Sequence, residues 1–450
     1  MQIRVLAHNI DLQRLHCLFP ERYPFLLQST APGPPLGRFD ILFAFPGNTL
    51  ELAFDGSLTG NHASGTGGFL AALDDWWRAE YRPGHGTELP FTGGWFLYLG
   101  YELAAEIEPT LRFHADAQLP RAFAVRCPAA IIYDHTDGQA VFVAEESAQT
   151  DFEQEQVLAD IEHAAPARHD AHAVCQSMSN DEDPPQGFLR AVSTAKDYIA
   201  AGDIYQANLS RRWTATMDDD IEFDRVYRAL CSTNPAPFAG MVRWRNTAIV
   251  SSSPERLLQI RNGIASTRPI AGTRPRSDDH DLDDSLSAEL FAHAKERAEH
   301  VMLIDLERND LGRICEPGTV EVDEMMVLES YAHVHHIVSN VRGRLRADVA
   351  PGEVIRAVFP GGTITGCPKV RCMQIINELE GVARGAYTGS FGYLNRDGSL
   401  DLNILIRTMV VQGNTVTLRA GSGIVADSDP EAELAEARAK AEGLLRALRQ

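Results

Sequence analysis

Apolar and polar residues are distributed differently on the two sides of about residue 164. In the first part, short apolar runs are separated by Gly and Pro, as in FDILFAFPG and AAIIYDH. Such runs are typical of strands joined by tight turns. The strand-like runs occupy 39–47, 93–104, 129–135 and 139–146, and helical spacing of apolar residues predicts helices over 68–80 and 151–163.

Residues 164–187 separate the two parts. This stretch is polar, rich in Pro, Ser and Asp, and has no apolar period. Such a composition is typical of a linker. The sequence therefore predicts an N-terminal region over 1–163, a linker over 164–187 and a second region over 188–450. The Gly-rich stretch 59–68 is interpreted as a loop without a ligand.

The second region combines long helical patterns with groups of strand-like runs. A helix over about 188–201 and a Gly-Asp turn precede a strand that starts at Ile204. A long charged helical segment follows at 286–309, and the chain ends in a helix at 430–449 that is rich in Ala, Glu and Arg. Strands that follow one another closely, with helices between the groups, favour an antiparallel-rich α+β fold over repeated βαβ units.

The stretch FPGGTITGCPKVRCMQIINELE, residues 359–380, joins a glycine loop to a helix. Pro368 suits the first helical turn, where its missing N–H costs nothing. Helical spacing predicts that one face of 368–380 is buried. The residues on that predicted face are Val370, Met373, Ile376 and Leu379.

The start of this helix is a candidate anion site. Its free N–H groups and positive dipole end suit a carboxylate or a phosphate. Thr363, Thr365 and Lys369 add hydroxyl and ammonium donors. The spacing is not that of a P-loop, because no G-K-[ST] follows a four-residue gap. The alternative is a tight turn before a core helix, with no ligand.

Composition and charge narrow the classes of function. The 450 residues are 44% hydrophobic and 23% charged, as in ordinary globular proteins. A formal net charge of −21 argues against nucleic acid or an anionic membrane surface as a partner. An anionic substrate would then need a cationic pocket or a metal. Scattered cysteines indicate reduced thiols, and no membrane-spanning run or signal-peptide pattern is found, so we expect a cytoplasmic protein.

Two pairs of glutamates recur at helical spacing. Glu296 and Glu299 lie three residues apart, and so do Glu433 and Glu436. Such pairs usually mark a solvated helix face. The first pair, however, precedes the apolar run VMLIDL, whose helix must be largely buried. Four converging carboxylates would require a divalent cation between them, and oxygen ligands favour Mg²⁺.

Histidines and a further glutamate are candidates for acid–base chemistry. In a strand over SYAHVHHIVSN, His333 and His335 face one way and His336 the other. Because no thiols lie nearby, a buried polar or catalytic histidine is favoured over a zinc ligand. Glu255 in SSSPERLL follows a proline at the end of an apolar run. This position is compatible with the first turn of a helix and with an acid that faces a site.

Seven segments appear in the order found in chorismate-utilising enzymes, and the chain resembles that family. They are GDIYQANLS (202–210), SSSPERLL (251–258), RPIAGTRPR (268–276), KERAEHVMLIDLERNDLGR (295–313), GGTITGCPK (361–369), ILIRT (404–408) and AGSGIVADSDPEAE (420–433). The resemblance is dense over 187–450 and looser before it. It implies an α/β sandwich of two large, mostly antiparallel sheets with helices outside, in which 164–187 can lie within one intertwined body.

The resemblance also implies roles for individual residues. It matches Glu255 to the acid at the leaving hydroxyl of chorismate and His336 to the active-site histidine. The Mg²⁺ carboxylates are Glu296, Glu299, Glu433 and Glu436, with Glu299 and Glu436 as direct ligands. The substrate-binding set is Thr363, Thr365, Lys369, Tyr387, Arg407, Gly421 and Gly423, and the catalytic set also includes Gln206, Ala271, Thr273 and Lys440.

Two positions bear on the nucleophile. Relatives that add water to chorismate carry a lysine where this chain has Gln206. A glutamine cannot act as a base near neutral pH, so we expect ammonia, and not water, as the nucleophile. Aminodeoxychorismate synthases commonly carry a nucleophilic lysine where this chain has Ala271, and PIAGT matches anthranilate synthases instead. The segments NLS, TITGCPK and LDLNILIRT resemble aminodeoxychorismate synthases. Weighing these above the single alanine, we expect aminodeoxychorismate synthase component I, with anthranilate synthase component I as the alternative.

The chain carries no glutaminase motif, so we expect ammonia from a separate glutamine amidotransferase subunit, on a route to p-aminobenzoate and folate. The stretch FLLQS at 25–29 resembles a segment that lines a tryptophan pocket in anthranilate synthases. Leu27 and Ser29 are therefore candidates to contact a bound tryptophan, with Gln28 in place of an acid.

Two other classes of function remain as alternatives. One is a non-catalytic regulator that binds chorismate or tryptophan, which the retained Glu255, His336 and Arg407 argue against. The other is a metal hydrolase unrelated to chorismate, which only the paired glutamates support.

Overall fold

The computed structural model describes residues 1–6, 10–31, 37–60, 62–63, 67–84, 86–114, 119–147, 150–164, 178–218, 221–276, 279–292, 294–330 and 334–449. Within these ranges, no helix combines the length and the apolar character that a membrane span requires.

The described strands form two large sheets in which neighbouring strands are antiparallel. The strands of the first sheet are β1 (Gln2–Val5), β2 (Phe25–Gln28), β3 (Phe39–Ala44), β8 (Ala129–Asp134), β9 (Gln139–Ala144), β10 (Met178–Glu182), β11 (Gln206–Met217), β12 (Phe238–Trp244), β13 (Thr247–Ser253), β19 (Gly366–Cys367), β22 (Thr408–Gln412) and β23 (Thr415–Ile424). Their order is β1-β9-β8-β3-β2-β12-β13-β22-β23-β11-β10, and β19 pairs with β11.

The second sheet has the order β16-β18-β15-β14-β21-β20-β6-β7-β4-β5, and β17 pairs with β18. Its strands are β4 (Thr49–Leu52), β5 (Leu58–Gly60), β6 (Gly94–Leu99), β7 (Ala122–Cys127), β14 (Arg256–Arg261), β15 (Ile264–Thr267), β16 (Ile270–Pro275), β17 (Glu321–Ser330), β18 (Val334–Arg344), β20 (Ser390–Asn395) and β21 (Leu400–Asn403).

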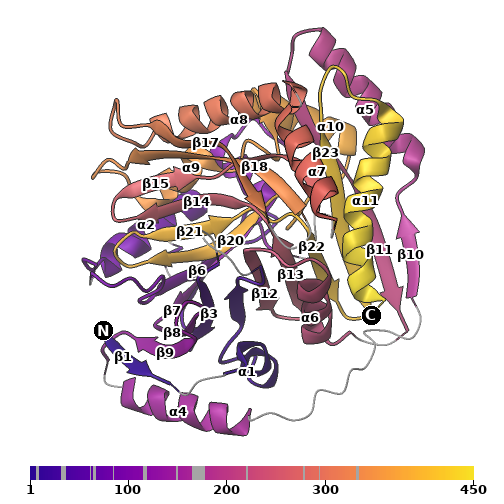
Figure 1. Ribbon diagram of the computed structural model, residues 1–450. Coiled ribbons are helices and arrows are strands. Elements are labelled where there is room, and N and C mark those ends of the chain that lie inside the picture. Colours follow the sequence, from indigo (N-terminus) through magenta and orange to yellow (C-terminus); the bar gives the residue numbers. More distant parts are fainter. Residues whose placement is uncertain are drawn as a thin grey trace.

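The helices lie mainly on the outer faces of the two sheets (Figure 1). They are α1 (Leu12–Leu18), α2 (Gly68–Glu80), the 3₁₀ helix η1 (Tyr101–Leu103), α3 (Ala104–Ile107), α4 (Thr150–His163), α5 (Pro185–Ala200), α6 (Phe223–Thr233), α7 (His280–Ala292), α8 (Ala294–Gly312), α9 (Pro351–Val358), α10 (Lys369–Glu380) and α11 (Pro430–Leu448).

An aromatic core fills the space between the sheets. Phe25 of the first sheet stacks on Phe96 of the second with their ring centroids 4.2 Å apart, and Phe123 and Phe391 join the same cluster. Two further clusters bury the helices against the outer faces: α1, α5, α6, α10 and α11 on the first sheet, and α2, α8 and α9 on the second. The predicted sandwich of two antiparallel sheets with helices outside is confirmed.

Strands from distant parts of the chain are neighbours in both sheets. In the first sheet β2 pairs with β12, and in the second β6 pairs with β20. In each sheet the strands from before residue 164 form one block and the later strands form another, and the two blocks are joined by these pairs into one continuous sheet. Of the predicted linker, 165–177 lie outside the described residues, 178–182 form β10, and α5 begins at Pro185.

Most predicted elements are confirmed, with shifts at their ends. The helices predicted over 68–80 and 151–163 are α2 and α4. The run 93–104 is a strand only to Leu99 and then turns into η1 and α3, so its last part was wrongly interpreted as strand. The helical segment 286–309 falls into two helices, α7 and α8, and the strand expected from Ile204 begins at Gln206.

Candidate active site

The glycine loop between α9 and α10 is held against α8. A Cβ added at Gly362 would collide with the Leu306 side chain and would lie 3.2 Å from Oε1 of Glu307. The Thr365 hydroxyl donates to the Gly361 carbonyl at 2.8 Å, which closes the turn. The loop is therefore confirmed, and Thr365 uses its hydroxyl inside the loop. The Thr363 hydroxyl makes no such internal bond.

Helix α10 is confirmed, but its buried face is rotated from the predicted one. Pro368 is the N-cap, and the buried residues are Cys372, Met373, Ile375 and Ile376. Val370 is 39% exposed, contrary to the prediction. Because an α-helix has 3.6 residues per turn, positions three apart drift by about 60° at each step, so the first member of such a row leaves the buried stripe.

Glu255 lies in the connection between β13 and β14 and not in a helix, so the helical interpretation was wrong. Its side chain is buried, and Ile404 N–H donates to its main-chain oxygen at 3.0 Å. Burial raises the pKa of Glu255 to about 8; the Thr363 hydroxyl beside the carboxyl lowers the pKa, and ionised Glu307 raises it. Glu255 is therefore a protonated acid at neutral pH.

His336 and Arg407 come together from β18 and the start of β22. Burial and, to a smaller extent, the nearby Arg407 guanidinium lower the pKa of His336 to about 4. The imidazole is therefore neutral at pH 7. On the opposite face of β18, His335 contacts Asp283 at 3.0 Å, while His333 lies outside the described residues.

Arg407 combines two unusual properties. Its φ of 50° is uncommon for a residue other than glycine, and such strain often occurs at functional sites. Burial lowers the pKa of the guanidinium. Within the described part of the chain no carboxylate forms an ion pair with it, so this cation can receive an anion.

A second group of predicted residues meets on β11, β23 and α11. The Gln206 amide packs directly against Gly423, where a Cβ would collide with it. Lys440 donates to the Gly421 carbonyl at 2.9 Å and also binds Glu436 at 2.7 Å. Figure 1 shows α11 in yellow alongside these strands. The structure therefore places Gln206, Gly421 and Gly423 next to the C-terminal helix, α11.

Tyr387 is connected to this group through Ser210, which pairs with Gly421 across the two strands. Burial raises the pKa of the Tyr387 phenol, Arg384 lowers it, and the Ser210 hydroxyl is close enough to lower it as well. The Arg384 guanidinium lies 5.6 Å from the centre of the Tyr387 ring. Tyr387 is therefore a neutral, buried phenol beside the strand of Gly421.

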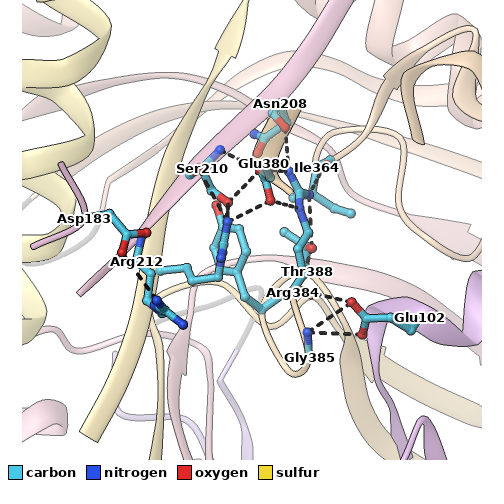
Figure 2. A network of polar contacts seen from close by, with 12 residues as sticks. Glu102, Asp183, Asn208, Ser210, Arg212, Ile364, Glu380, Arg384, Gly385 and Thr388 are labelled. Carbon is cyan, nitrogen blue, oxygen red and sulfur yellow. Dashed lines mark hydrogen bonds and ion pairs between the residues drawn. The ribbon is translucent and has the colours of Figure 1, made fainter. Parts of the chain in front are cut away.

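A buried polar network supports this wall of the site (Figure 2). Arg384 pairs with Glu380 at 2.6 Å and donates to the main-chain oxygens of Asn208 at 2.6 Å and Ile364 at 3.2 Å. The Glu102 carboxylate accepts the Arg384 N–H at 2.7 Å. One arginine thus ties the glycine loop to β11, and a glutamate from the N-terminal part fixes that arginine.

The predicted metal carboxylates differ in their surroundings. Glu299 of α8 is half-buried, and the side chain of Glu296 lies outside the described residues. Oε2 of Glu433 is buried and accepts no hydrogen bond, whereas Glu436 is 52% exposed and paired with Lys440. Among the described side chains, no three His, Cys, Asp or Glu groups gather into a metal site. The unpartnered Glu433 oxygen is the feature that fits a cation.

Lys369 has a partner within the protein. Its ammonium lies 2.5 Å from Asp310 of α8 and donates to the Val358 carbonyl at 3.0 Å. Both side chains are almost fully buried. Lys369 therefore anchors the start of α10 to α8. Its ammonium is occupied by these two partners and is not free for the predicted contact with substrate.

Leu27 and Ser29 line an open pocket of about 1470 Å³, and residues of both sheets contribute to its lining. The Ser29 hydroxyl is buried and has no hydrogen-bond partner. Gln28 points to the other face of β2, where it donates to Asp40 at 2.9 Å.

Ala271 and Thr273 lie on β16, where they are opposite Ile337 and His336 of β18. Their side chains lie outside the description, but the register places both positions beside His336.

Sequence reasoning missed the buried carboxyl of Glu307 and the network of Glu380, Arg384 and Arg419. Glu307 follows His300 by seven residues, on the face of α8 that buries Leu303 and Ile304. A glutamate at that spacing within an apolar stripe was the available signal. The Arg384 network carries no such signal, because its partners come from four separate segments.

Comparison with known proteins gives consistent matches. The family described as chorismate binding enzyme matches residues 62–446. An anthranilate synthase component I-like protein of Synechocystis is 44% identical, with 80% of this chain and 73% of that protein covered. Aminodeoxychorismate synthase component 1 of Bacillus subtilis is 36% identical over 97% of this chain and 94% of its own. The crystal structure of anthranilate synthase component I from Streptococcus pneumoniae superposes with a TM-score of 0.81 at 32% identity, covering 92% of this chain and 93% of that one.

Proposed function

The chain belongs to the family of chorismate binding enzymes, and on this premise we propose that it is component I of an aminodeoxychorismate synthase. The proposed reaction adds ammonia at C4 of chorismate. The 4-hydroxyl leaves as water once it has been protonated.

The observation that carries the proposal is the protonated, buried Glu255. With a pKa of about 8, this carboxyl holds a proton at pH 7 and can donate it to the departing hydroxyl. Arg407, which has no carboxylate partner among the described residues, is suited to bind a carboxylate of chorismate. His336 stays neutral beside Arg407 and so adds no competing charge. A proton donor (Glu255), a cation (Arg407) and a neutral histidine (His336) are together suited to a substrate that carries two carboxylates and a leaving hydroxyl.

Mg²⁺ is part of this proposal. Glu296, Glu299, Glu433 and Glu436 would hold it, and binding through Glu436 requires Lys440 to release that carboxylate. The unpartnered Oε2 of Glu433 supports the assignment. Bound there, Mg²⁺ would offset the charge of a chorismate carboxylate.

We propose ammonia as the nucleophile and C4 as the position it attacks because of the segments around Gln206. Asn208 N–H donates to the Thr365 carbonyl at 2.9 Å, and Gln206 pairs with Cys367. The segments NLS and TITGCPK, which resemble aminodeoxychorismate synthases, are therefore bonded to each other and form one wall. The amide of Gln206 on this wall cannot take a proton from water, which favours ammonia, itself a nucleophile.

Anthranilate synthase component I is the second candidate. Ala271 favours it, because alanine cannot form the covalent adduct that a lysine would form at this position. The names of relatives such as the Streptococcus pneumoniae protein also favour it. In either case we propose that a separate glutamine amidotransferase subunit supplies the ammonia. Tryptophan is proposed as the ligand of the Ser29 cavity.

One incubation distinguishes the two candidates. Purified protein is mixed with chorismate, Mg²⁺ and ammonium chloride, and the products are separated before and after an aminodeoxychorismate lyase is added. We expect p-aminobenzoate only with the lyase. Anthranilate and pyruvate without the lyase would establish the second candidate, and unchanged chorismate would overturn both. Glu255→Gln, tested in parallel, shows whether any turnover belongs to this site.

A further inference from the structure

A second buried carboxyl lies beside Glu255, and the proposed reaction does not use it. Glu307 of α8 is 5% exposed, as is Glu255. Gly362 and Thr363 of the glycine loop connect the two carboxyls: Oε1 of Glu307 lies 3.2 Å from the Cβ position of Gly362, and the Thr363 hydroxyl lies beside the Glu255 carboxyl. The two carboxyls therefore share one dry region beneath the loop.

The cation in this region is already paired with another carboxylate. Lys369 is the cation that acts on Glu307, and it is bound to Asp310 at 2.5 Å. Arg313 also acts on Asp310. The ion pair leaves Glu255 and Glu307 without a cation of their own among the described residues. Two buried carboxyls in this situation cannot both ionise at low cost, so at neutral pH they hold a proton between them.

Neighbouring groups decide where that proton lies. Burial and the nearby Asp310 raise the pKa of Glu307, whereas Lys369, the Thr267 hydroxyl and the Gly362 N–H lower it. Glu255 faces Thr363, Glu307 and the backbone of Ile270, and its pKa is about 8. Glu307 has a nearby ammonium and two hydrogen-bond donors, whereas no cation among the described residues acts on Glu255. The carboxylate is therefore more stable on Glu307, and the proton is more stable on Glu255.

We propose that Glu307 is a positioning residue for the acid: its carboxylate keeps the proton on Glu255 until the leaving group of the substrate takes it. This inference rests on the proposed role of Glu255. Glu307 itself touches neither substrate nor leaving group in this arrangement. It acts through the negative charge that it places next to Glu255.

An infrared titration of the protein without substrate tests the proposal directly. The carbonyl stretch of protonated Glu255 is identified as the band that Glu255→Gln removes. In Glu307→Gln we expect the midpoint of this band to fall by about one pH unit, because the neighbouring negative charge is gone. Glu307→Asp, which keeps the charge, should leave the midpoint near that of the unchanged protein. Asp305→Asn is the matched control, because Asp305 lies on the exposed face of the same helix, paired with Arg308.

The titration separates this inference from the proposed function. An unchanged Glu255 midpoint in folded Glu307→Gln would overturn the role of Glu307, whichever product the enzyme makes. A shifted midpoint in a protein that does not consume chorismate would support the carboxyl pair and overturn the proposed reaction. If Glu307→Gln does not fold, Glu307→Asp decides, because a midpoint displaced by more than about half a pH unit despite the retained charge would contradict the proposal.

Discussion

The Arg384 guanidinium lies 2.6 Å from the Glu380 carboxylate, and neither side chain is more than 3% exposed. Arg419 binds the other oxygen of Glu380 at 2.7 Å. Burial acts against all of these charges, yet the two arginines hold the pKa of Glu380 below its usual value. This ion pair joins the end of α10 to β11 and, through Ile364, to the glycine loop.

Glu380→Gln should therefore destabilise the fold. The substitution leaves two buried arginines without a carboxylate, and removing one partner of a buried ion pair typically costs about 3–5 kcal/mol. Urea unfolding measures this loss. Glu378→Gln on the exposed side of the same helix is the control and should change the free energy of unfolding by less than about 0.5 kcal/mol. Equal stability of the two variants would contradict the importance of the network.

Glu255→Gln should affect activity and stability in opposite directions. Turnover by the unchanged enzyme should fall as pH rises through about 8, where Glu255 loses its proton. The variant should lose about 10²–10⁴-fold in kcat, the usual contribution of a general acid. A pH profile of kcat/KM without an alkaline limb near 8 would show that another group is the acid.

The stability effect of Glu255 follows from the sign of its pKa shift. The folded pKa of about 8 exceeds the ordinary value of 4.5, so its contribution to stability is complete below about pH 4.5 and is lost as pH rises toward 8. Glutamine does not ionise. Glu255→Gln should therefore melt at a higher temperature than the unchanged protein at pH 8, and the difference should shrink at pH 5.

Arg407→Met should weaken chorismate binding and leave the fold intact. The guanidinium has no ion pair among the described residues, so its removal leaves no buried carboxylate behind. Loss of a charge-assisted contact should raise KM by about 10- to 100-fold. Arg308→Met is the control, because Arg308 is exposed and paired with Asp305. An unchanged KM in Arg407→Met would place the substrate carboxylate elsewhere.

Lys369 and Asp310 should behave as one structural pair. Lys369→Met and Asp310→Asn should each cost about 3 kcal/mol or more, since each leaves a buried charge unmatched. The double variant should lose less than the sum, and unfolding of all four proteins measures this coupling. If Lys369 instead binds substrate, the double variant will raise KM as much as Lys369→Met does.

Removal of Mg²⁺ with a chelator should abolish chorismate turnover. Glu433→Gln should weaken Mg²⁺ binding by about tenfold or more in calorimetry, because the unpartnered oxygen is replaced by an amide. Glu442→Gln, further along α11 and paired with Arg449, should bind Mg²⁺ normally. Equal Mg²⁺ affinity of Glu433→Gln and the unchanged protein would remove Glu433 from the metal site.

Local patterns were sufficient for most of the secondary structure. Apolar periodicity placed α2, α4 and α10, because a helix that packs on a sheet must keep its apolar residues on one face. Val370 was misplaced because a three-residue repeat drifts around a helix of 3.6 residues per turn. The end of β6 was misplaced because an apolar run continues without a break from strand to helix, and no local signal marks the change.

The sequence alone determined the family resemblance and the antiparallel sandwich, and it selected Glu255, His336 and Arg407 as candidate site residues, because motif order and apolar spacing are local properties. Only the tertiary structure decided what each charged group faces. It assigned Lys369 to Asp310, placed Glu307 under the glycine loop and left Arg407 without a carboxylate among the described residues. The partner of a buried charge comes from a segment distant in the chain, and desolvation sets its pKa, so neither can be read from the neighbouring residues.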